Sequence, residues 1–361
     1  MTLVNPIQHP DAPELDELCQ KLAAMADETD RAGTWPAEQL RLCGEYGVYR
    51  WFMPATWGGF DWDENYVTRG YLRLAAACLT TTFIITQRTG ACRRILTAEH
   101  NRSLQERLLP ELVSGTTFAT VGISHLTTSR RHLAKPVLAA REVEGGFVLD
   151  GFSPWVTGGL HAQTVVIGAT LPDERQILVA LPMDLPGVSA DPPAELVGVR
   201  SSHTGAVRCQ EVLVSDDHLI AGPVHDVMKQ GEGAGTGGLQ TSTLAVGLAS
   251  AAIDYLLREA EVRRDLLPAA EQLRSEQQQM EADLLALADG QKVCTLEDFR
   301  ARANSLALRS AQASLAAAKG TGYVAGHPAG RWCREALFFL VWSCPQPVMA
   351  ANLCELAGLS D

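Results

Sequence analysis

The first third of the chain carries hydrophobic residues at helical spacing. Over residues 14–114 apolar positions return every three or four residues, most regularly in Tyr71–Cys78 and Ser103–Leu112. This spacing gathers them on one face of an α-helix. The Gly58–Gly59 pair interrupts the pattern, as expected of residues that favour turns. We therefore predict a helical N-terminal domain over residues 1–115.

In the middle third the pattern changes to short runs of β-branched residues. The segments VVIGATL and QILVALPM are bounded by glycine, proline and aspartate, which is typical of β-strands. The sequence EGGF at Glu144–Phe147 supplies a turn between two further runs of this kind. We predict a central antiparallel β domain over residues 116–222.

The last third becomes helical again after a glycine-rich passage. Residues Leu244–Val262 are rich in alanine and leucine. Thr295 stands three residues before Asp298 at the start of a long helical pattern, as in an N-terminal capping box. We predict a helical C-terminal domain over residues 223–361. Helices, then strands, then helices make an α+β chain, and this order argues against a doubly wound dinucleotide-binding sheet.

Composition and charge narrow the class of protein. Of the residues 46% are hydrophobic, but no run of about eighteen apolar residues occurs, so we expect no membrane span. The N-terminus lacks the pattern of a secretion signal, and we therefore expect a cytoplasmic protein. The formal net charge of −12 argues against a nucleic-acid partner.

Cysteine spacing argues against both disulfides and metal binding. Nine cysteines are spread along the chain and none forms a C-x-x-C pair. Several lie in apolar helical context, as Cys78 does in LAAACL, so we expect free, buried thiols in a reducing compartment. No group of histidines and cysteines has the spacing of metal ligands, and we predict no metal site.

Residues 319–345, KGTGYVAGHPAGRWCREALFFLVWSCP, resemble the C-terminal signature of the acyl-CoA dehydrogenase family. That signature runs G-G-x-G-[YF], a loop with a proline, R-x-x-R-[DE]-A and a helix ending in Y-E-G-T. Other segments resemble further family motifs in the family's order: PAEQLRLCGEYGVYRWFMPATWGGF, GFVLDGFSPWVTGG and VGVRSSHTGAVRCQEVLVSDDHLI. The resemblance covers nearly the whole chain. It implies the family's fold with a C-terminal domain of four-helix-bundle type, FAD as cofactor, and a homodimer or homotetramer.

The resemblance implies four residues at the flavin. In the family a W-[IV]-[ST] strand packs on the flavin, with a hydroxyl near its reactive nitrogen, and Trp155 and Thr157 occupy those positions. Ser124 takes the hydroxyl position of a second flavin strand, and Ser129 retains a hydroxyl for the phosphates. His125 replaces the family's glutamate there; it is either a flavin-side acid or base or a hydrogen-bonded loop residue. The alternative for Trp155 is a packed strand tryptophan.

The dinucleotide end of the implied cofactor site departs further from the family. Arg263 aligns with an arginine that reaches the pyrophosphate across a subunit contact, and Gly320 belongs to the G-G-x-G turn. Ala316 and Pro345 replace a glutamine and a threonine of the family pattern. A guanidinium on a helix suits bidentate phosphate binding, whereas the alternative for Arg263 is an exposed helix charge.

Both positions at which the family carries its catalytic glutamate are empty. Ser343 stands at the usual position, and Gly237 stands at the position used by a minority of members. Removing a proton α to a thioester carbonyl needs a base such as a carboxylate, which serine does not supply. The remaining carboxylates considered are Asp61 and Asp63, near a family substrate-entry loop, and Glu335, whose family counterpart forms a structural ion pair.

Three functions follow from the resemblance. The first is an FAD-dependent oxidoreductase that oxidises a CH–CH bond of an acyl-CoA or other acyl thioester with a non-standard base. The second is a flavin oxidase or monooxygenase on the same fold, which needs no α-proton base. The third is a non-catalytic relative that binds an acyl ligand or a partner subunit. The empty base positions motivate the second and third.

Overall fold

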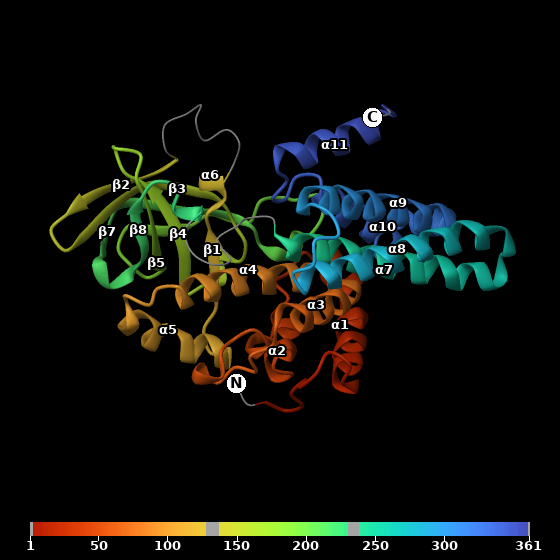
Figure 1. Ribbon diagram of the computed structural model, residues 1–361, viewed down its shortest axis with the longest axis horizontal. Coiled ribbons are helices and arrows are strands. Elements are labelled where there is room, and N and C mark those ends of the chain that lie inside the picture. The colour runs from red at the N-terminus through yellow and green to blue at the C-terminus, as the bar shows by residue number, and fades with distance from the viewer. Residues whose placement is uncertain (1–2, 128–136, 230–237, 360–361) are drawn as a thin grey trace.

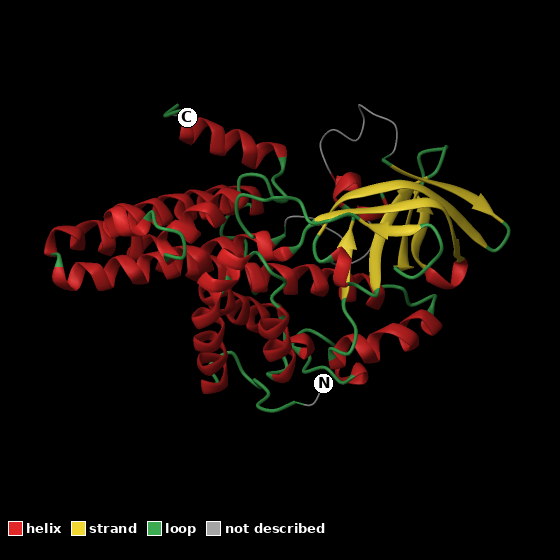
Figure 2. Cartoon of the chain, turned by 180° about the vertical axis from the view of Figure 1, so that it is seen from behind, coloured by secondary structure: helices red, strands yellow, loops and turns green. Residues whose placement is uncertain are grey.

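The computed structural model of the chain describes residues 3–127, 137–229 and 238–359. Within them, a group of helices, a sheet and a second group of helices follow one another along the chain, as Figure 1 and Figure 2 show. This order confirms the predicted α+β class.

The N-terminal part of the chain is helical. Its helices are α1 (Pro13–Ala32), α2 (Ala37–Glu45), α3 (Glu64–Ala77), α4 (Leu79–Leu96) and α5 (Arg102–Ser114). Asp63 caps α3, because its carboxylate accepts a hydrogen bond of 2.8 Å from the Tyr66 N–H. The helical pattern is interrupted at the Gly58–Gly59 pair, as predicted. Glycine is needed at position 59, because a Cβ atom there would lie 1.8 Å from the Met53 carbonyl oxygen.

The central part is one sheet whose strands are mostly antiparallel. The strands are β1 (Ala119–Gly122), β2 (Leu138–Val143), β3 (Gly146–Val156), β4 (Thr164–Thr170), β5 (Gln176–Pro182), β6 (Val188–Ala190), β7 (Gly205–Ser215) and β8 (Leu219–Val224). Their order is β6-β7-β3-β2-β4-β5-β8, and β1 pairs with β4. The predicted turn joins β2 to β3, with Gly145 at a φ of 77°.

Two pairings of this sheet differ from the antiparallel expectation. Strand β1 runs parallel to β4 along its whole length, and β2 pairs in parallel with β4 at Ala139 and Thr170. The strand pattern did not predict these pairings, because a parallel pair is joined by a long crossover through other elements rather than by a local turn.

The C-terminal part is helical, as predicted. It contains α7 (Leu239–Val262), α8 (Leu267–Ala288), α9 (Leu296–Gly322), α10 (Pro328–Phe338) and α11 (Gln346–Leu356). Helices α7, α8 and α9 run beside one another, and α11 lies over α9 (Figure 1). The predicted cap of α9 is confirmed, because the Thr295 hydroxyl accepts a hydrogen bond of 3.1 Å from the Asp298 N–H.

Helices from both ends of the chain share one hydrophobic core. Leu74 of α3 and Leu248 of α7 belong to the same buried cluster. The two helices approach so closely that a Cβ atom at Gly247 would lie 2.6 Å from the Leu72 carbonyl oxygen. A second cluster joins α4 and α5 to β1, and a third fills the inner face of the sheet. The sheet is therefore fixed against the helices through α4.

The cysteines are free thiols, and four of the nine are buried: Cys43, Cys78, Cys92 and Cys209. The other five are partly exposed, so burial is less complete than the apolar context of the sequence predicts. Among the helices of the described ranges, none is both long and apolar enough to cross a membrane.

Candidate functional site

The end of strand β3 places an exposed aromatic ring beside buried hydroxyls. Trp155 is 56% exposed although it is large and apolar. Two residues later Thr157 is buried, and its Oγ1 lies 3.0 Å from the Thr204 Oγ1. The Thr204 hydroxyl in turn lies 2.8 Å from the Ser202 Oγ. We call Thr157, Thr204 and Ser202 the hydroxyl chain. The Thr204 and Ser202 hydroxyls fix the orientation of the Thr157 hydroxyl.

The turn after Thr157 holds the hydroxyl chain against the N-terminal helices. Gly158 has a φ of 66°, and its N–H donates to the Ser202 carbonyl at 3.0 Å. A Cβ atom at Gly158 would lie 2.6 Å from the Trp35 ring, so glycine is required both for the backbone and for the close approach. The sequence motif contains these glycines, but only the fold shows what they pack against.

Two histidines extend this support to the end of α1. The His203 Nε2–H donates to the Gly33 carbonyl at 3.1 Å, so the His203 Nδ1 accepts from the His161 Nε2–H at 2.9 Å. Trp35 stacks on His161 with ring centroids 4.1 Å apart. Burial and the neighbouring His203 lower the pKa of His161, which favours the neutral ring that this arrangement needs.

Sequence reasoning missed the supporting residues Ser202, Thr204, His161 and His203. The segment VGVRSSHTGAV was recognised as a strand-pair motif. Its alternation of hydroxyl and imidazole side chains was the available signal for a polar cluster.

The second predicted flavin strand leads into a short helix. Ser124 begins α6 (Ser124–Thr127), directly after β1. The His125 Nε2–H donates to the Gly168 carbonyl of β4 at 2.8 Å, which fixes the tautomer of the ring. Burial lowers the pKa of His125, so the side chain is neutral at neutral pH. This is the hydrogen-bonded alternative for His125. Ser129 lies outside the described residues.

The R-x-x-R-E-A motif on α10 forms a buried ion-pair network. Arg331 is buried, and its Nε lies 2.8 Å from the Asp27 carboxylate and its Nη1 3.1 Å from the Glu335 carboxylate. Arg334 pairs with Asp30 of α1. Burial raises the pKa of Glu335 to about 7 against the opposing charge of Arg331. The expected structural ion pair of Glu335 is therefore present.

Ser343 lies in the turn between α10 and α11 and has no carboxylate beside it in sequence. Its φ is 43°, in the left-handed region that non-glycine residues seldom adopt. Arg300 of α9 holds this turn, since its Nη2 donates to the Trp342 carbonyl at 3.0 Å. A serine hydroxyl does not accept a proton at neutral pH without a base of its own. Gly237, the other base position, lies outside the described residues.

The alternative carboxylates are occupied elsewhere or exposed. Asp63 caps α3 and Glu335 belongs to the buried network. Asp61 lies in the loop before α3, with a φ of 56°, and it lines an open depression of about 570 Å³ beside Trp62. The structure does not bring Asp61, Asp63 or Glu335 together with Ser343 through any recorded contact among the described residues.

The two segments implied at the dinucleotide end do lie together. Arg263 ends α7, and its Nη2 donates to the Glu259 carboxylate at 2.7 Å and to the Ala317 carbonyl at 2.5 Å. Gly320 follows three residues after Ala317, beyond a kink at Lys319, and its Cβ position is open. The Nη2 group of Arg263 is therefore engaged within its own chain, and phosphate binding would fall to the remaining N–H donors of the guanidinium.

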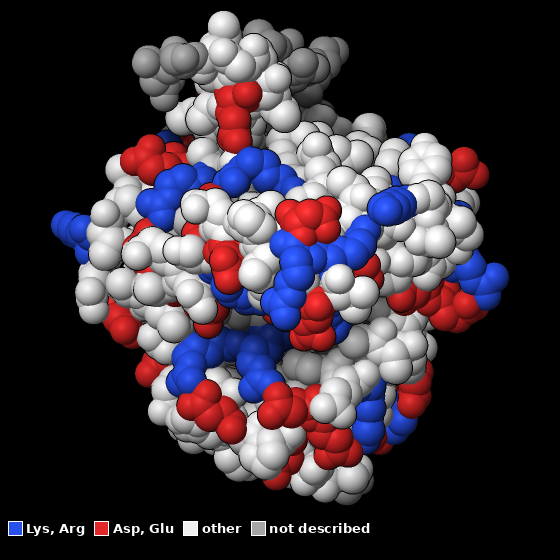
Figure 3. All heavy atoms as spheres, turned by 90° about the vertical axis from the view of Figure 1, so that its right-hand side faces the viewer, with Lys and Arg blue, Asp and Glu red and all other residues white. Residues whose placement is uncertain are grey.

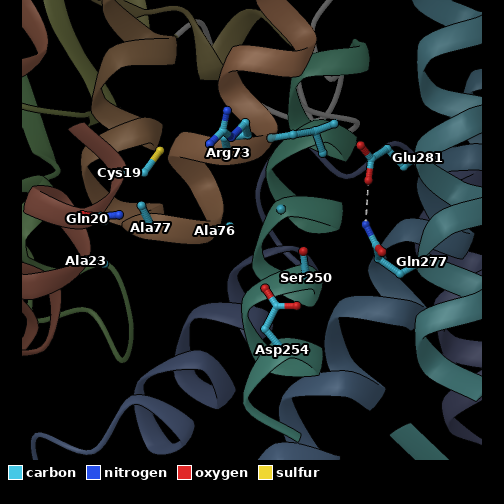
Figure 4. A pocket seen from close by; sticks show the side chains of 12 residues that line it. Cys19, Gln20, Ala23, Arg73, Ala76, Ala77, Ser250, Asp254, Gln277 and Glu281 are labelled. Carbon is cyan, nitrogen blue, oxygen red and sulfur yellow. Dashed lines mark hydrogen bonds between the residues drawn. The ribbon is translucent and has the colours of Figure 1, made fainter. Parts of the chain in front are cut away.

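A cleft of about 450 Å³ opens between helices of the N-terminal and C-terminal parts. It is lined by residues of α1, α3, α7 and α8: Cys19, Gln20, Ala23, Leu72, Arg73, Ala76, Ala77, Gly247, Ser250, Asp254, Gln277 and Glu281. Figure 4 shows Gln277 donating to Glu281, at 2.9 Å. On the face seen in Figure 3, acidic and basic side chains are interspersed around a hollow. None of the predicted site residues lines this cleft.

Known proteins resemble this chain in both sequence and fold. Residues 15–116 match the family model "Acyl-CoA dehydrogenase, N-terminal domain". Over 339 residues the chain is 24% identical to the probable acyl-CoA dehydrogenase YngJ of Bacillus subtilis (strain 168), covering 88% of each protein. A glutaryl-coenzyme A dehydrogenase in complex with glutaryl-CoA superposes with a TM-score of 0.80 at 17% identity, covering 97% of this chain and 96% of that one. A prolyl acyl carrier protein oxidase gives 0.76 at 17% identity, covering 96% and 100%.

The fold is that of acyl-CoA dehydrogenase-like flavoproteins. The matched N-terminal domain and the sequence relatives support the acyl-CoA dehydrogenase family, as the sequence motifs predicted. The similar solved structures confirm the predicted fold.

Proposed function

We propose that the protein is an FAD-dependent oxidoreductase that oxidises a CH–CH bond of an acyl-CoA or another acyl thioester, using a base other than the family's glutamate. The observation that carries this proposal is the exposed Trp155 beside the buried, hydrogen-bonded Thr157 hydroxyl. Family membership supports the reaction class.

The ring-side residues suit a flavin. An aromatic side chain that remains exposed on a sheet offers a flat apolar surface, and Trp155 is such a side chain. The Thr157 hydroxyl, fixed by Thr204, would donate to the ring. When bound, the flavin supplies the acceptor for a hydride. In this proposal Trp155 excludes water, Thr157 stabilises charge on the reduced ring, and Ser124 and Ser129 hold the pyrimidine and phosphate side.

The dinucleotide end suits FAD less well. Arg263 would contact the pyrophosphate through its Nε–H and Nη1–H groups, since Nη2 already donates to Glu259 and the Ala317 carbonyl. Gly320 leaves open space at the end of α9 where the cofactor's backbone contact would be made. We place Arg263 and Gly320 at this end, in a homodimer or homotetramer as in the family. A partner subunit would complete the site.

The proton that leaves the α carbon has no family carboxylate to accept it. Ser343 lacks the chemistry, and Asp63 and Glu335 hold structural hydrogen bonds and ion pairs. The His125 ring is neutral and directed at a main-chain carbonyl. The proposal therefore requires a substrate whose α-proton is acid enough to be removed by a weak base or by one that the substrate carries.

The lack of a carboxylate at the predicted base positions favours a second candidate, a flavin oxidase or monooxygenase. Reduced flavin that reacts with oxygen needs no base at the α carbon, so an empty base position is compatible with this chemistry. The similar prolyl acyl carrier protein oxidase supports it on this fold. A non-catalytic relative that binds an acyl ligand or a partner is the outcome if both fail.

A visible spectrum of the purified protein tests the proposal. We expect flavin absorption after incubation with FAD, and bleaching of the band after anaerobic addition of an acyl-CoA. A flavin-bound protein that no acyl thioester bleaches, but that consumes oxygen once the flavin is reduced, would favour the second candidate. A protein that binds no flavin would exclude both.

A further inference from the structure

Two imidazole rings join the sheet to the end of α1. His161 lies in the short helical turn after β3, and His203 lies in the loop before β7. The His161 Nε2 is 2.9 Å from the His203 Nδ1, and the His203 Nε2–H donates to the Gly33 carbonyl at 3.1 Å. Trp35 stacks on His161. We call His161, His203, Gly33 and Trp35 the imidazole joint.

The imidazole joint lies where main-chain contacts hold the turn at the end of β3. The Gly158 N–H donates to the carbonyls of Ser202 and His203, at 3.0 and 3.3 Å. In the same loop the Ser201 hydroxyl donates to the Thr29 carbonyl of α1 at 2.7 Å. The end of β3, the loop before β7 and the end of α1 are therefore fixed to one another through polar contacts that include both imidazoles.

The surroundings of the two rings offer little to balance a positive charge. Within the described parts of the chain, no carboxylate forms an ion pair or hydrogen bond with either ring. The Arg200 guanidinium lies 3.4 Å from the position that a Cβ atom at Gly33 would take. The charged side chains of the last turn of α1 pair elsewhere, Asp30 with Arg334 and Arg31 with Glu28. The Trp35 face can stabilise one cation on His161, but a second cation lacks a counter-ion.

The hydrogen bond between the rings tolerates one added proton but not two. The Gly33 carbonyl only accepts, so the His203 Nε2 carries a hydrogen in every form of the closed joint. A proton on either ring still leaves a donor facing a bare nitrogen, because the other ring stays neutral. A second proton sets two N–H groups against each other at 2.9 Å and makes both rings cations.

We infer that the imidazole joint is a pH-sensitive connection between the sheet and α1, which opens when His161 and His203 are both protonated. The ordinary imidazole pKa of about 6.5 puts this change in mildly acidic solution. Opening releases the turn that follows Thr157, so under the proposed function it competes with FAD binding. The connection itself does not depend on the proposed function.

Hydrogen exchange of the purified full chain, followed by mass spectrometry and corrected for the intrinsic effect of pH, measures the opening. The open joint takes up two protons and the closed joint takes up one. At about pH 5.5, one unit below the ordinary pKa, this difference of one proton favours opening about tenfold relative to about pH 7.5. We expect the protection of residues 157–163 and 199–204 to fall together by this factor, while α9 keeps its protection.

His203→Gln and His161→Gln should each abolish the pH dependence. An amide offers a donor and an acceptor but does not titrate, so one imidazole remains and the closed joint tolerates its single proton. His218→Gln is the matched control and should keep the tenfold change. His218 is also half-buried on the sheet, its Nδ1 lies 3.1 Å from the Ser215 Oγ, and burial lowers its pKa as it does for His161. If one of the two joint variants fails to fold, the other decides.

The possible failures are distinguishable. Equal protection at both pH values, or a fall that His203→Gln and His161→Gln both retain, would overturn the inference and leave the proposed function standing. Under the proposed function, saturating FAD should restore protection in acid, because a ligand that binds only the closed joint favours it. A chain that loses protection as expected but binds no FAD would overturn the proposed function and leave this inference standing.

Discussion

The sheet side and the helix side of the candidate site differ in how much of the family's machinery they retain. On the sheet side Trp155 and Thr157 stand at the positions that the sequence resemblance assigns to the flavin, and Thr204 and Ser202 fix the Thr157 hydroxyl. On the helix side the buried arginine network of α10 is present, and the resemblance puts Ser343 at the usual position of the glutamate. Under the proposed function, the framework of the helix side is kept while the catalytic group is not, so the loss of the base would be a local change.

The largest expected effect comes from the buried ion-pair network of Arg331, Asp27 and Glu335. Replacing Arg331 with methionine is expected to lower the free energy of unfolding by about 3–5 kcal/mol, because Glu335 and Asp27 lose their cation in a buried site. Urea unfolding at neutral pH measures the change. Arg309→Met is the control, since the Arg309–Glu276 pair is solvent-accessible and is worth less than about 1 kcal/mol. Equal losses in both variants would show that the network does not hold the helix side together.

The pH dependence of stability should separate the two sides. Burial raises the pKa of Glu335 to about 7, above its value in the unfolded chain. The stability that this group contributes is therefore complete below the unfolded pKa and is lost as the pH rises through about 7, by an amount on the order of 3 kcal/mol. Urea unfolding between pH 4.5 and 7.5 should show a flatter profile for Glu335→Gln than for the wild type. A profile that the substitution leaves unchanged would contradict a raised pKa.

His125 on the sheet side should act with the opposite sign. Burial lowers the pKa of its ring below the unfolded value. Its contribution is therefore present above the unfolded pKa of about 6.5 and is lost as the pH falls through the lower folded pKa. His125→Gln should reduce the loss of stability on the acid side only. An equal loss of stability at every pH in this variant would instead indicate that only the hydrogen bond to Gly168 matters.

A smaller effect is expected from the hydroxyl chain. Thr204→Val keeps the shape of the side chain but leaves the buried Thr157 and Ser202 hydroxyls without their shared partner. The free energy of unfolding should fall by about 1–3 kcal/mol, and the affinity for FAD should fall with it. Thr204→Ser retains the hydroxyl and serves as the control. An unchanged FAD affinity in Thr204→Val would remove the hydroxyl chain from the proposed cofactor site.

The smallest expected effect comes from placing a carboxylate at position 343. It tests whether a base at this position can act on the α carbon. Ser343→Glu is expected to raise the rate of anaerobic flavin reduction by butyryl-CoA by at least about tenfold, or about 1.4 kcal/mol of barrier. Ser343→Gln has nearly the same size and no basic group, so it should give no gain. Equal rates in the two variants would mean that a group at this position no longer reaches the α carbon.

The sequence predicted the elements well and the site in part. Bounded runs of β-branched residues and helical spacing of apolar residues predicted the order of helices and strands, and the cap at Thr295 followed from local chemistry. The parallel pairing of β1 with β4 was not predictable, because it depends on a crossover between distant segments. Trp155 and Thr157 came from a motif, whereas Thr204 and His161 needed the fold to show that they support Thr157.

By itself the sequence determined the order of helices and strands, and its motifs indicated the acyl-CoA dehydrogenase family and predicted a serine at the usual base position, because each of these depends on residue identity along the chain. Only the tertiary structure decided that Arg263 is engaged by Glu259 and the Ala317 carbonyl, and that Phe83 packs against Trp342 from the other end of the chain. Such contacts join residues far apart in sequence, and close packing of the whole core selects them rather than the preferences of any one segment.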